Sequence, residues 1–203
     1  MAIYKVNLKF KVQNSKLLNF EIRLLTFMIM SYFFIFLGAA LRFIPHSANF
    51  APIGAMALFG GAKINKKYAL IIPLAAMLIS DYFIGFYSWQ VMASVYGSFL
   101  IYGLLGLWAR KNESWLKIGG ATLAGSVLFF LITNGAVWAF GSMYPHDLAG
   151  LISCYAAGLP FWRNTLLGDI FFTAVFFSAY ELARKYAAIP LKKRFLNKVF
   201  DRA

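Results

Sequence analysis

The feature that most constrains this chain is a series of long, almost uninterrupted runs of apolar residues. Residues 24–42 read LLTFMIMSYFFIFLGAALR, and residues 118–140 read IGGATLAGSVLFFLITNGAVWAF. A run of about 20 mostly apolar residues is long enough for a helix to cross the hydrocarbon core of a bilayer. Because the runs are continuous rather than alternating, they do not resemble the strands of a membrane β-barrel.

Composition excludes the other classes of protein. Hydrophobic residues make up 61% of the 203 residues and charged residues only 13%, whereas soluble domains carry about a quarter charged residues. A soluble fold of this size has too little interior to bury so much apolar surface. The aromatic content of 19% argues against disorder, and the single cysteine excludes an internal disulfide framework. An integral membrane protein remains.

The spacing of the runs predicts an all-α, polytopic membrane helix bundle with six transmembrane helices. A segment that is too polar at its ends to span, residues 141–163, is expected to be an outer structured loop or a partly inserted segment. The helical domain, residues 24–185, lies between a basic N-terminal tail, 1–23, and a basic C-terminal tail, 186–203. The expected helices cover residues 24–42, 48–62, 68–86, 91–109, 118–140 and 164–185.

The first apolar run also has features of a cleaved signal peptide. Gly38, Ala39 and Ala40 are small residues of the kind found at a cleavage site. The 23 residues before the run are too many for the charged start of a signal peptide, so we expect a retained helix.

The distribution of lysine and arginine predicts the orientation. Residues 63–67 carry three lysines, and residues 110–117 and the C-terminal tail carry both lysine and arginine, whereas the three remaining connections carry only Arg42 and Arg163. Since positive loops stay on the cytoplasmic side, we expect both termini in the cytoplasm. The net charge of +13 then reflects flanks that lie beside anionic lipid, and it requires no nucleic acid.

Polar residues in the outer half of the predicted bundle indicate a binding pocket. Ionisable groups inside a membrane are costly and mark functional sites, so we expect Asp81 and Asp169 to line one shared cavity and Arg163 to hold an anionic group or to pair with Asp169. The alternative is structural, with two Arg–Asp pairs that tie helix ends together. The candidate substrate-binding residues are Asn49, Asp81, Asn134, Trp138, Arg163, Asn164 and Asp169.

Signals for catalysis or a metal are weak. His46, His146, Asp147 and Cys154 all fall in expected outer loops and offer metal-binding atoms, but their spacing matches no compact ligand motif. Cys154 has no base nearby in sequence to activate it. Nucleotide-binding and hydrolase motifs are absent from the sequence. We therefore expect no enzyme activity, no catalytic residue, no resident metal and no cofactor.

Four stretches of the chain carry a resemblance to known families. They are RFIPHSANFAPIGAMALFGGA (42–62), PLAAMLISDYFIG (73–85), GSVLFFLITNGAVW (125–138) and YAAGLPFWRNTLLGD (155–169). Together they resemble a family of small bacterial inner-membrane proteins of unknown function. The layout is also similar to the substrate-binding S-components of energy-coupling factor (ECF) vitamin transporters. That similarity implies a vitamin or precursor held near the outer face and an ECF-type energising module as partner.

One departure from the S-component pattern affects the partner. S-components commonly contact their module through small residues four apart on the first helix, but here Ser31 is followed by Ile35, and the pair Ala51 and Ala55 lies on the second expected helix. The alternative that the protein works without such a module therefore also stays open. The sequence predicts small-molecule uptake, with a non-transporting scaffold subunit or a membrane enzyme with an outer metal site as alternatives.

Overall fold

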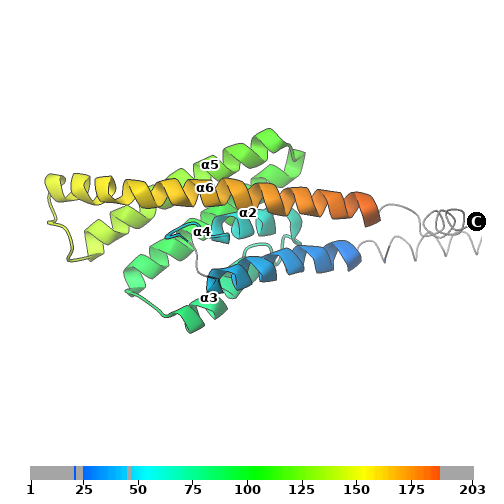
Figure 1. Ribbon diagram of the computed structural model, residues 1–203, viewed down its shortest axis with the longest axis horizontal. Coiled ribbons are helices and arrows are strands. Elements are labelled where there is room, and N and C mark those ends of the chain that lie inside the picture. The colour runs from blue at the N-terminus through cyan, green and yellow to red at the C-terminus, as the bar shows by residue number, and fades with distance from the viewer. Residues whose placement is uncertain (1–20, 22–24, 45–46, 188–203) are drawn as a thin grey trace, which may run out of the picture. The chain divides into compact units, whose positions relative to one another are not determined.

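The computed structural model describes residue 21 and residues 25–44 and 47–187 of the chain. These residues form six α-helices and no strand, which confirms the all-helical bundle (Figure 1). The first helix, Leu25–Phe43, ends in a 3-10 turn, η1. The others are α2 (Ile53–Lys63), α3 (Ile71–Ile84), α4 (Trp89–Ala109, followed by the 3-10 turn η2, Arg110–Asn112), α5 (Trp115–Phe140) and α6 (Leu148–Ala187).

Four of the described helices are long and apolar enough to cross a membrane, namely the first helix, α4 with η2, α5 and α6. The chain is therefore a multi-pass membrane protein. Helices α2 and α3 have 11 and 14 residues, which at 1.5 Å per residue gives about 17 and 21 Å, less than the hydrocarbon thickness of about 30 Å. The predicted number of six helices is confirmed, but α2 and α3 are each too short to cross the hydrocarbon core of a bilayer.

The described residues divide into two compact units. One comprises the described parts of residues 1–31 and 178–203, where the rings of Phe27 and Tyr180 are 6.5 Å apart and Arg184 forms an ion pair with Glu181 at 2.6 Å. The other, residues 32–177, contains every candidate site residue that the sequence predicts.

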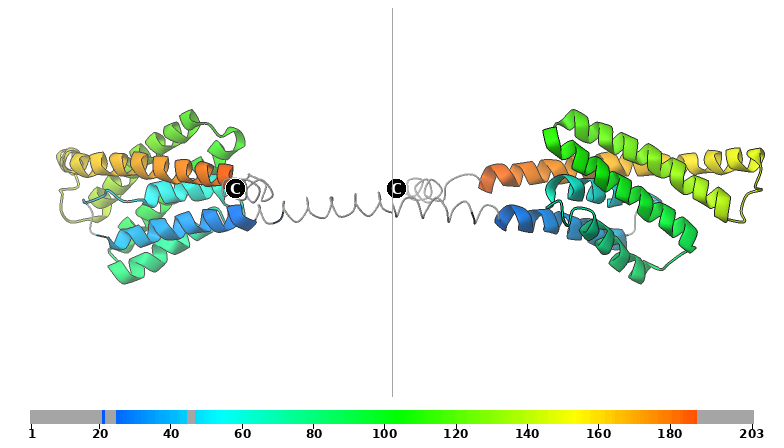
Figure 2. Two further views of the ribbon diagram at one scale, coloured as in Figure 1. Left: turned by 45° about the vertical axis from the view of Figure 1, so that its right-hand side comes forward. Right: turned by 180° about the vertical axis from the view of Figure 1, so that it is seen from behind.

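Helix α2 is the centre of the larger unit. All residues from Gly54 to Ala62 are buried, as expected of a helix that is apolar on every side. It packs most extensively against α4, where a Cβ at Gly61 would lie 2.1 Å from the carbonyl oxygen of Gly103 and a Cβ at Gly106 would lie 2.2 Å from that of Leu58. Small residues thus let the two backbones touch. It also contacts α3 and α5 and packs against α6, where a Cβ at Gly54 would lie 2.2 Å from Oδ1 of Asp169, so that α2 lies between α4 and α6 (Figure 2).

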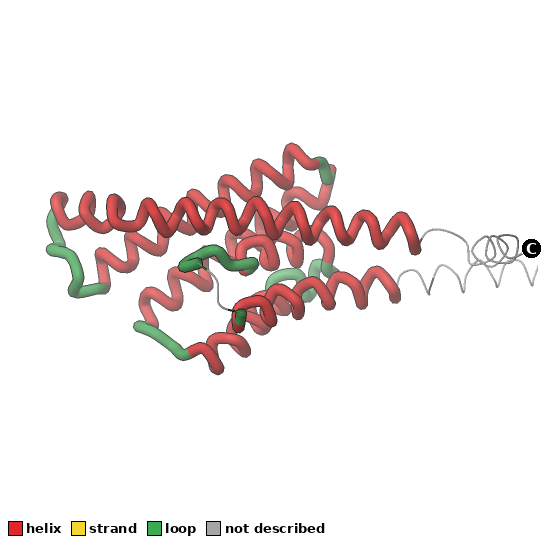
Figure 3. Tube along the Cα trace, in the orientation of Figure 1, coloured by secondary structure: helices red, strands yellow, loops and turns green. Residues whose placement is uncertain are grey.

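The connections of this unit gather at two ends. The α3–α4 and α5–α6 connections lie at one end, whereas the α2–α3 and α4–α5 connections lie at the other (Figure 3). The segment before α2, residues 47–52, is not helical and lies along the middle of α6. Its Phe50 ring packs on Phe171 and Phe172, with centroids 6.0 and 5.6 Å apart.

The expected outer loop at residues 141–163 is wrong for residues 148–163, which form the first part of α6. Asp147 caps this helix by accepting a hydrogen bond at Oδ1 from the backbone N–H of Gly150, at 2.7 Å. Pro160 lies inside the helix and removes one backbone donor. Packing against α5 outweighs that loss, because the Phe130 ring contacts both Tyr155 and Trp162.

Candidate functional site

The first polar centre joins the first helix, α3 and α4 around Asp81. The guanidinium of Arg42 pairs with Oδ1 of Asp81 at 2.5 Å and also donates to the carbonyl of Met77, at 3.1 Å, and to the hydroxyl of Ser80. The phenol of Tyr96 donates to Oδ2 of Asp81 at 2.6 Å. Both carboxylate oxygens are therefore occupied, and the side chain of Asp81 is only 4% exposed.

Tyr87, in the connection between α3 and α4, lies close enough to this centre for the charges of Asp81 and Arg42 to act on its phenol. Burial of its phenol and the negative charge of Asp81 raise the pKa of Tyr87, and the charge of Arg42 partly opposes that effect. The phenol stays neutral at physiological pH. The formal charges of Arg42 and Asp81 then cancel within the cluster.

The second polar centre lies deeper, between α2, α4, α5 and α6. Asp169 is 1% exposed, and its Oδ2 accepts a hydrogen bond from the phenol of Tyr102. The Tyr102 ring lies between two glycines, since a Cβ at Gly54 would be 3.0 Å and one at Gly125 would be 2.5 Å from ring carbon Cε1. Oδ1 of Asp169 lies against Gly54, where a Cβ would approach it to 2.2 Å.

The two carboxylates do not share a binding partner. Asp81 uses Tyr96 and Asp169 uses Tyr102, which are six residues, or about 9 Å of helix rise, apart on α4. Six residues also rotate the side-chain direction to a different face of the helix. The expectation of one shared cavity is thus unsupported by the contacts. The hydrogen bond from Tyr102 also places Asp169 beside the interior of α4 and away from both helix ends.

Arg163 and Asp169 do not form the expected ion pair. Arg163 is exposed and has no hydrogen-bonding or ionic partner within the described part of the chain, while Asp169 points into the interior. The two residues are six positions apart on α6, so that they too lie on different faces. Only one of the two possible Arg–Asp pairs, Arg42 with Asp81, is present.

Asn49 lies in the non-helical segment 47–52, and Asn164 lies on the part of α6 that contacts this segment. Asn49 has a φ of 64°, the left-handed conformation that asparagine tolerates better than most residues, and it sits in a turn closed by the N–H of Phe50 and the carbonyl of Ser47 at 2.9 Å. The side-chain amide of Asn164 donates to the carbonyl of Ala48 at 3.0 Å. Both residues therefore shape residues 47–52, and the Asn49 side chain is exposed.

Asn134 and Trp138 hold α5 against the start of α6. The amide of Asn134 donates to the carbonyl of Phe130 at 2.9 Å, and its Oδ1 lies so close to α6 that a Cβ at Gly158 would meet it at 2.4 Å. The indole N–H of Trp138 donates to the carbonyl of Pro145 at 3.0 Å. These two candidates organise the helical hairpin and lie apart from both carboxylates.

Among the described residues, no group of three or more histidine, cysteine, aspartate or glutamate side chains could hold a metal ion. His146 contacts the carbonyl of Gly141 at 3.1 Å and packs edge-on against Trp138. Cys154 is buried and donates to the carbonyl of Asn134 at 3.4 Å. His46, the remaining candidate ligand, lies outside the described residues.

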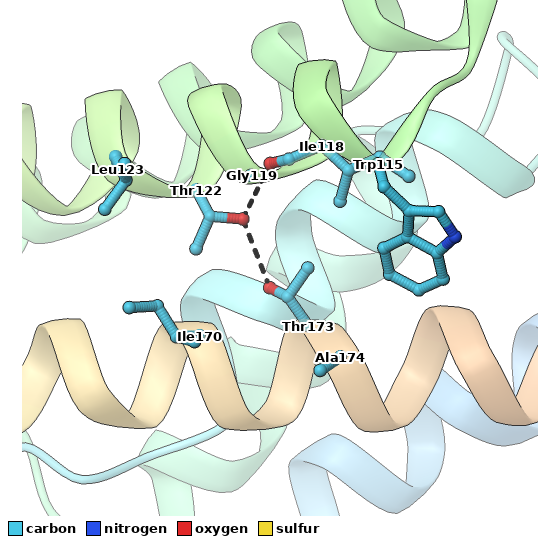
Figure 4. A pocket seen from close by; sticks show the side chains of 8 residues that line it. All are labelled: Trp115, Ile118, Gly119, Thr122, Leu123, Ile170, Thr173 and Ala174. Carbon is cyan, nitrogen blue, oxygen red and sulfur yellow. Dashed lines mark hydrogen bonds between the residues drawn. The ribbon is translucent and has the colours of Figure 1, made fainter.

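A groove between α5 and α6 is lined by none of the seven candidate residues. It has a volume of about 300 Å³, and Figure 4 shows the hydroxyls of Thr122 and Thr173 facing each other across it, 3.5 Å apart, with Trp115 at one end. The lining is almost entirely apolar, and Ile170 and Leu123 are exposed. In a bilayer such a groove faces lipid and offers few polar contacts for a polar ligand.

Sequence reasoning missed the two tyrosines and the glycines beside them. Tyr96 and Tyr102 stand inside an apolar run, where a phenol needs a hydrogen-bond partner, and that requirement was a usable signal. Gly54 and Gly125 leave room for the Tyr102 ring, a role that depends on helices that are distant in sequence.

Comparison with known proteins gives a family without an assigned activity. A family of unknown function, DUF6580, matches residues 22–192. The chain belongs to this family. No curated protein and no solved structure matches the chain. The DUF6580 match covers both polar centres, α2 and the non-helical segment before it, while the similarity to ECF S-components receives no support from these comparisons.

Proposed function

We propose that this DUF6580 protein binds a small polar molecule from the outer side of the bacterial inner membrane and mediates its uptake. The observation that carries the proposal is the non-helical segment 47–52, which leads into the short helix α2 beside the buried carboxylate of Asp169. Irregular backbone at membrane depth is tolerated where it is buried in protein or lines a water-filled cavity. Interrupted helices beside polar groups are typical of transporter binding sites.

The charge pattern supports entry from the outer side. The end of the larger unit that holds the α2–α3 and α4–α5 connections carries Lys63, Lys66, Lys67, Arg110 and Lys111. The opposite end, with the α3–α4 and α5–α6 connections (Figure 3), is poor in lysine and arginine by sequence. The positive-inside rule assigns the basic end to the cytoplasm. Arg42, shortly before the segment that carries Asn49, pairs with Asp81, four residues before the α3–α4 connection at the opposite end.

Two of the predicted ligand contacts remain available in this arrangement. The side chains of Arg163 and Asn49 are exposed, and neither has a side-chain hydrogen bond to another described residue. Arg163 can bind an anionic group of the solute, such as a carboxylate or phosphate. Asn164 fixes the adjoining backbone of Ala48. A vitamin or precursor and an ECF-type module are the solute class and the partner that the layout suggests.

A non-transporting scaffold subunit is the second candidate, and one observation favours it. Each carboxylate oxygen of Asp81 already has a partner, Arg42 or Tyr96, as expected of a charge that ties helix ends together. The side chain is buried, which leaves little access for a ligand.

A ligand-binding experiment separates the two candidates. The melting temperature of purified full-length protein in detergent is measured with thiamine, riboflavin, biotin, pantothenate and nicotinate, one at a time. In a separate experiment, native mass spectrometry of the purified protein searches for a copurified small molecule. Uptake predicts that one compound raises the melting temperature of the wild type and that Arg163→Gln loses the effect. Arg184→Gln is the matched control and should keep it. A scaffold predicts no shift with any compound and no copurified molecule.

A further inference from the structure

The carboxyl group of Asp169 is more deeply buried than that of Asp81, and no cationic side chain in the described part of the chain neutralises it. No lysine, arginine or histidine side chain among the described residues pairs with it, in contrast to Asp81. An unpaired carboxylate in an apolar interior is unfavourable, and a group in that position takes up a proton readily. Intramembrane carboxyl groups of this kind serve proton relays in pumps and transporters.

The surroundings of Asp169 make its two oxygens unequal. Oδ2 accepts the Tyr102 phenol, whereas Oδ1 faces the Cα of Gly54 and has no hydrogen-bond donor among the described residues. Helix α2 contributes Gly54 to this site and α5 contributes Gly125 and Ser126, none of which titrates. Tyr102 on α4 is thus the single titratable neighbour in the described structure. A proton from water can add to Oδ1 while Tyr102 keeps its own proton and its hydrogen bond.

Asp169 also lies beside the start of α2, and this position favours the ionised form of its carboxyl group. Gly54 is the second residue of α2, and the backbone N–H groups of a first helical turn favour a nearby negative charge. The adjoining segment is tightly packed, since a Cβ at Gly168 would lie 3.2 Å from the backbone nitrogen of Ala51. Gain or loss of one proton at Asp169 therefore changes the electrostatic balance where α2, residues 50–51 and α6 meet.

We propose that Asp169 is an intramembrane proton-binding site and that its protonation is the step that couples solute uptake to the proton gradient. In the forward direction Oδ1 receives a proton from the outer side to give a neutral carboxylic acid, and it later releases that proton to the cytoplasmic side as a carboxylate. Tyr102 positions the carboxyl group and is not consumed. The coupling half of this inference rests on the proposed function, in the form in which the protein works without an ECF-type module, whereas the proton-binding half does not.

Infrared difference spectroscopy of the full-length protein in lipid nanodiscs tests proton binding without a solute. On acidification from about pH 9 to about pH 5, a window that brackets neutral pH, the wild type should gain a carboxylic C=O band that Asp169→Asn lacks. The control Asp147→Asn, at the exposed start of α6, should keep the band. Tyr102→Phe should move the band to higher wavenumber, because the carbonyl loses its hydrogen bond. A band that persists in Asp169→Asn, or no band in the wild type, would overturn the proposal.

A second measurement tests the coupling separately. The thermal shift produced by whichever compound of the vitamin panel binds is measured across the same pH window. Coupling predicts that the apparent affinity changes at least severalfold with pH in the wild type and stays constant in Asp169→Asn. A pH-independent affinity in the wild type overturns the coupling and leaves the uptake function intact. Absence of any binding compound contradicts the uptake function, and with it the coupling, but leaves the infrared result standing.

Discussion

The phenol of Tyr102 donates a hydrogen bond to the carboxylate of Asp169 and so joins α4 to α6 in the interior of the bundle. Glycines on α2 and α5 bracket the tyrosine ring. One aromatic residue therefore sets the spacing of four helices. The ring and the carboxyl group are both almost fully buried. A larger side chain in place of either glycine would therefore displace the ring or the carboxyl group.

Gly54→Ala should destabilise the protein. The new Cβ would lie 2.2 Å from Oδ1 of Asp169 and 3.0 Å from the Tyr102 ring, and overpacking of this kind costs about 1–3 kcal/mol. Gly97→Ala on α4 is the matched control, because a Cβ there meets nothing within 4 Å, and it should stabilise the helix by about 0.5–1 kcal/mol. Thermal unfolding in detergent measures both. Equal melting temperatures for the two variants would contradict the close approach at Gly54.

Arg42→Gln should lower stability by about 3–5 kcal/mol, since it leaves the buried charge of Asp81 without its partner. Adding Asp81→Asn to that variant should recover part of the loss, because the unpaired charge is then removed. Arg184→Gln breaks the more exposed pair with Glu181 and should cost about 0–1 kcal/mol. A double-mutant cycle on thermal unfolding gives the coupling energy, and a value near zero for Arg42 and Asp81 would show that the pair is not structural.

Asn49→Gly should leave stability within a few tenths of a kcal/mol, whereas Asn49→Val should cost about 1–2 kcal/mol, since a left-handed φ of 64° strains a β-branched residue. The melting temperatures of the two variants check the backbone role. The same glycine variant also examines the side chain, because a ligand that contacts the Asn49 amide would lose affinity in Asn49→Gly despite an intact fold.

Cys154 should be unreactive towards a maleimide in the folded protein and reactive after denaturation, because its thiol is buried and donates to the carbonyl of Asn134. Mass spectrometry of the labelled protein measures the modified fraction. Cys154→Ser should fold normally and keep any ligand-induced thermal shift. Complete loss of that shift would instead indicate a thiolate that binds the ligand.

Both termini should be cytoplasmic. In a Cys154→Ser background, a cysteine at the exposed position Met143, between α5 and α6, should react with a membrane-impermeant maleimide on intact cells. A cysteine at Lys111, in η2 between α4 and α5, should react only after permeabilisation. The reverse pattern would invert the orientation and place Asn49 and Arg163 on the cytoplasmic side.

The composition and the apolar runs were enough to predict a membrane bundle of six helices. Hydrophobic length is a local property of the chain, because the bilayer sets it and tertiary neighbours do not. For that reason the predicted helices 91–109 and 118–140 agree within three residues with α4 (Trp89–Ala109) and α5 (Trp115–Phe140). The same local reasoning failed at residues 148–163, where the polar ends of the segment suggested a loop but contacts with Phe130 and Leu131 keep the helix intact.

The candidate site depended on contacts that the order of the sequence does not contain. Arg42, Asp81 and Asp169 could be identified from the cost of a charge inside a membrane, and that physical argument needs no structure. Which partner each charge acquires is decided by helix rotation and crossing. Arg42 therefore meets Asp81 across 39 positions, and Tyr102 meets Asp169 across 67, while Arg163 lies too far around α6 to reach Asp169. Sequence thus determined which residues require a partner, and only the packing of the helices decided which partners they have.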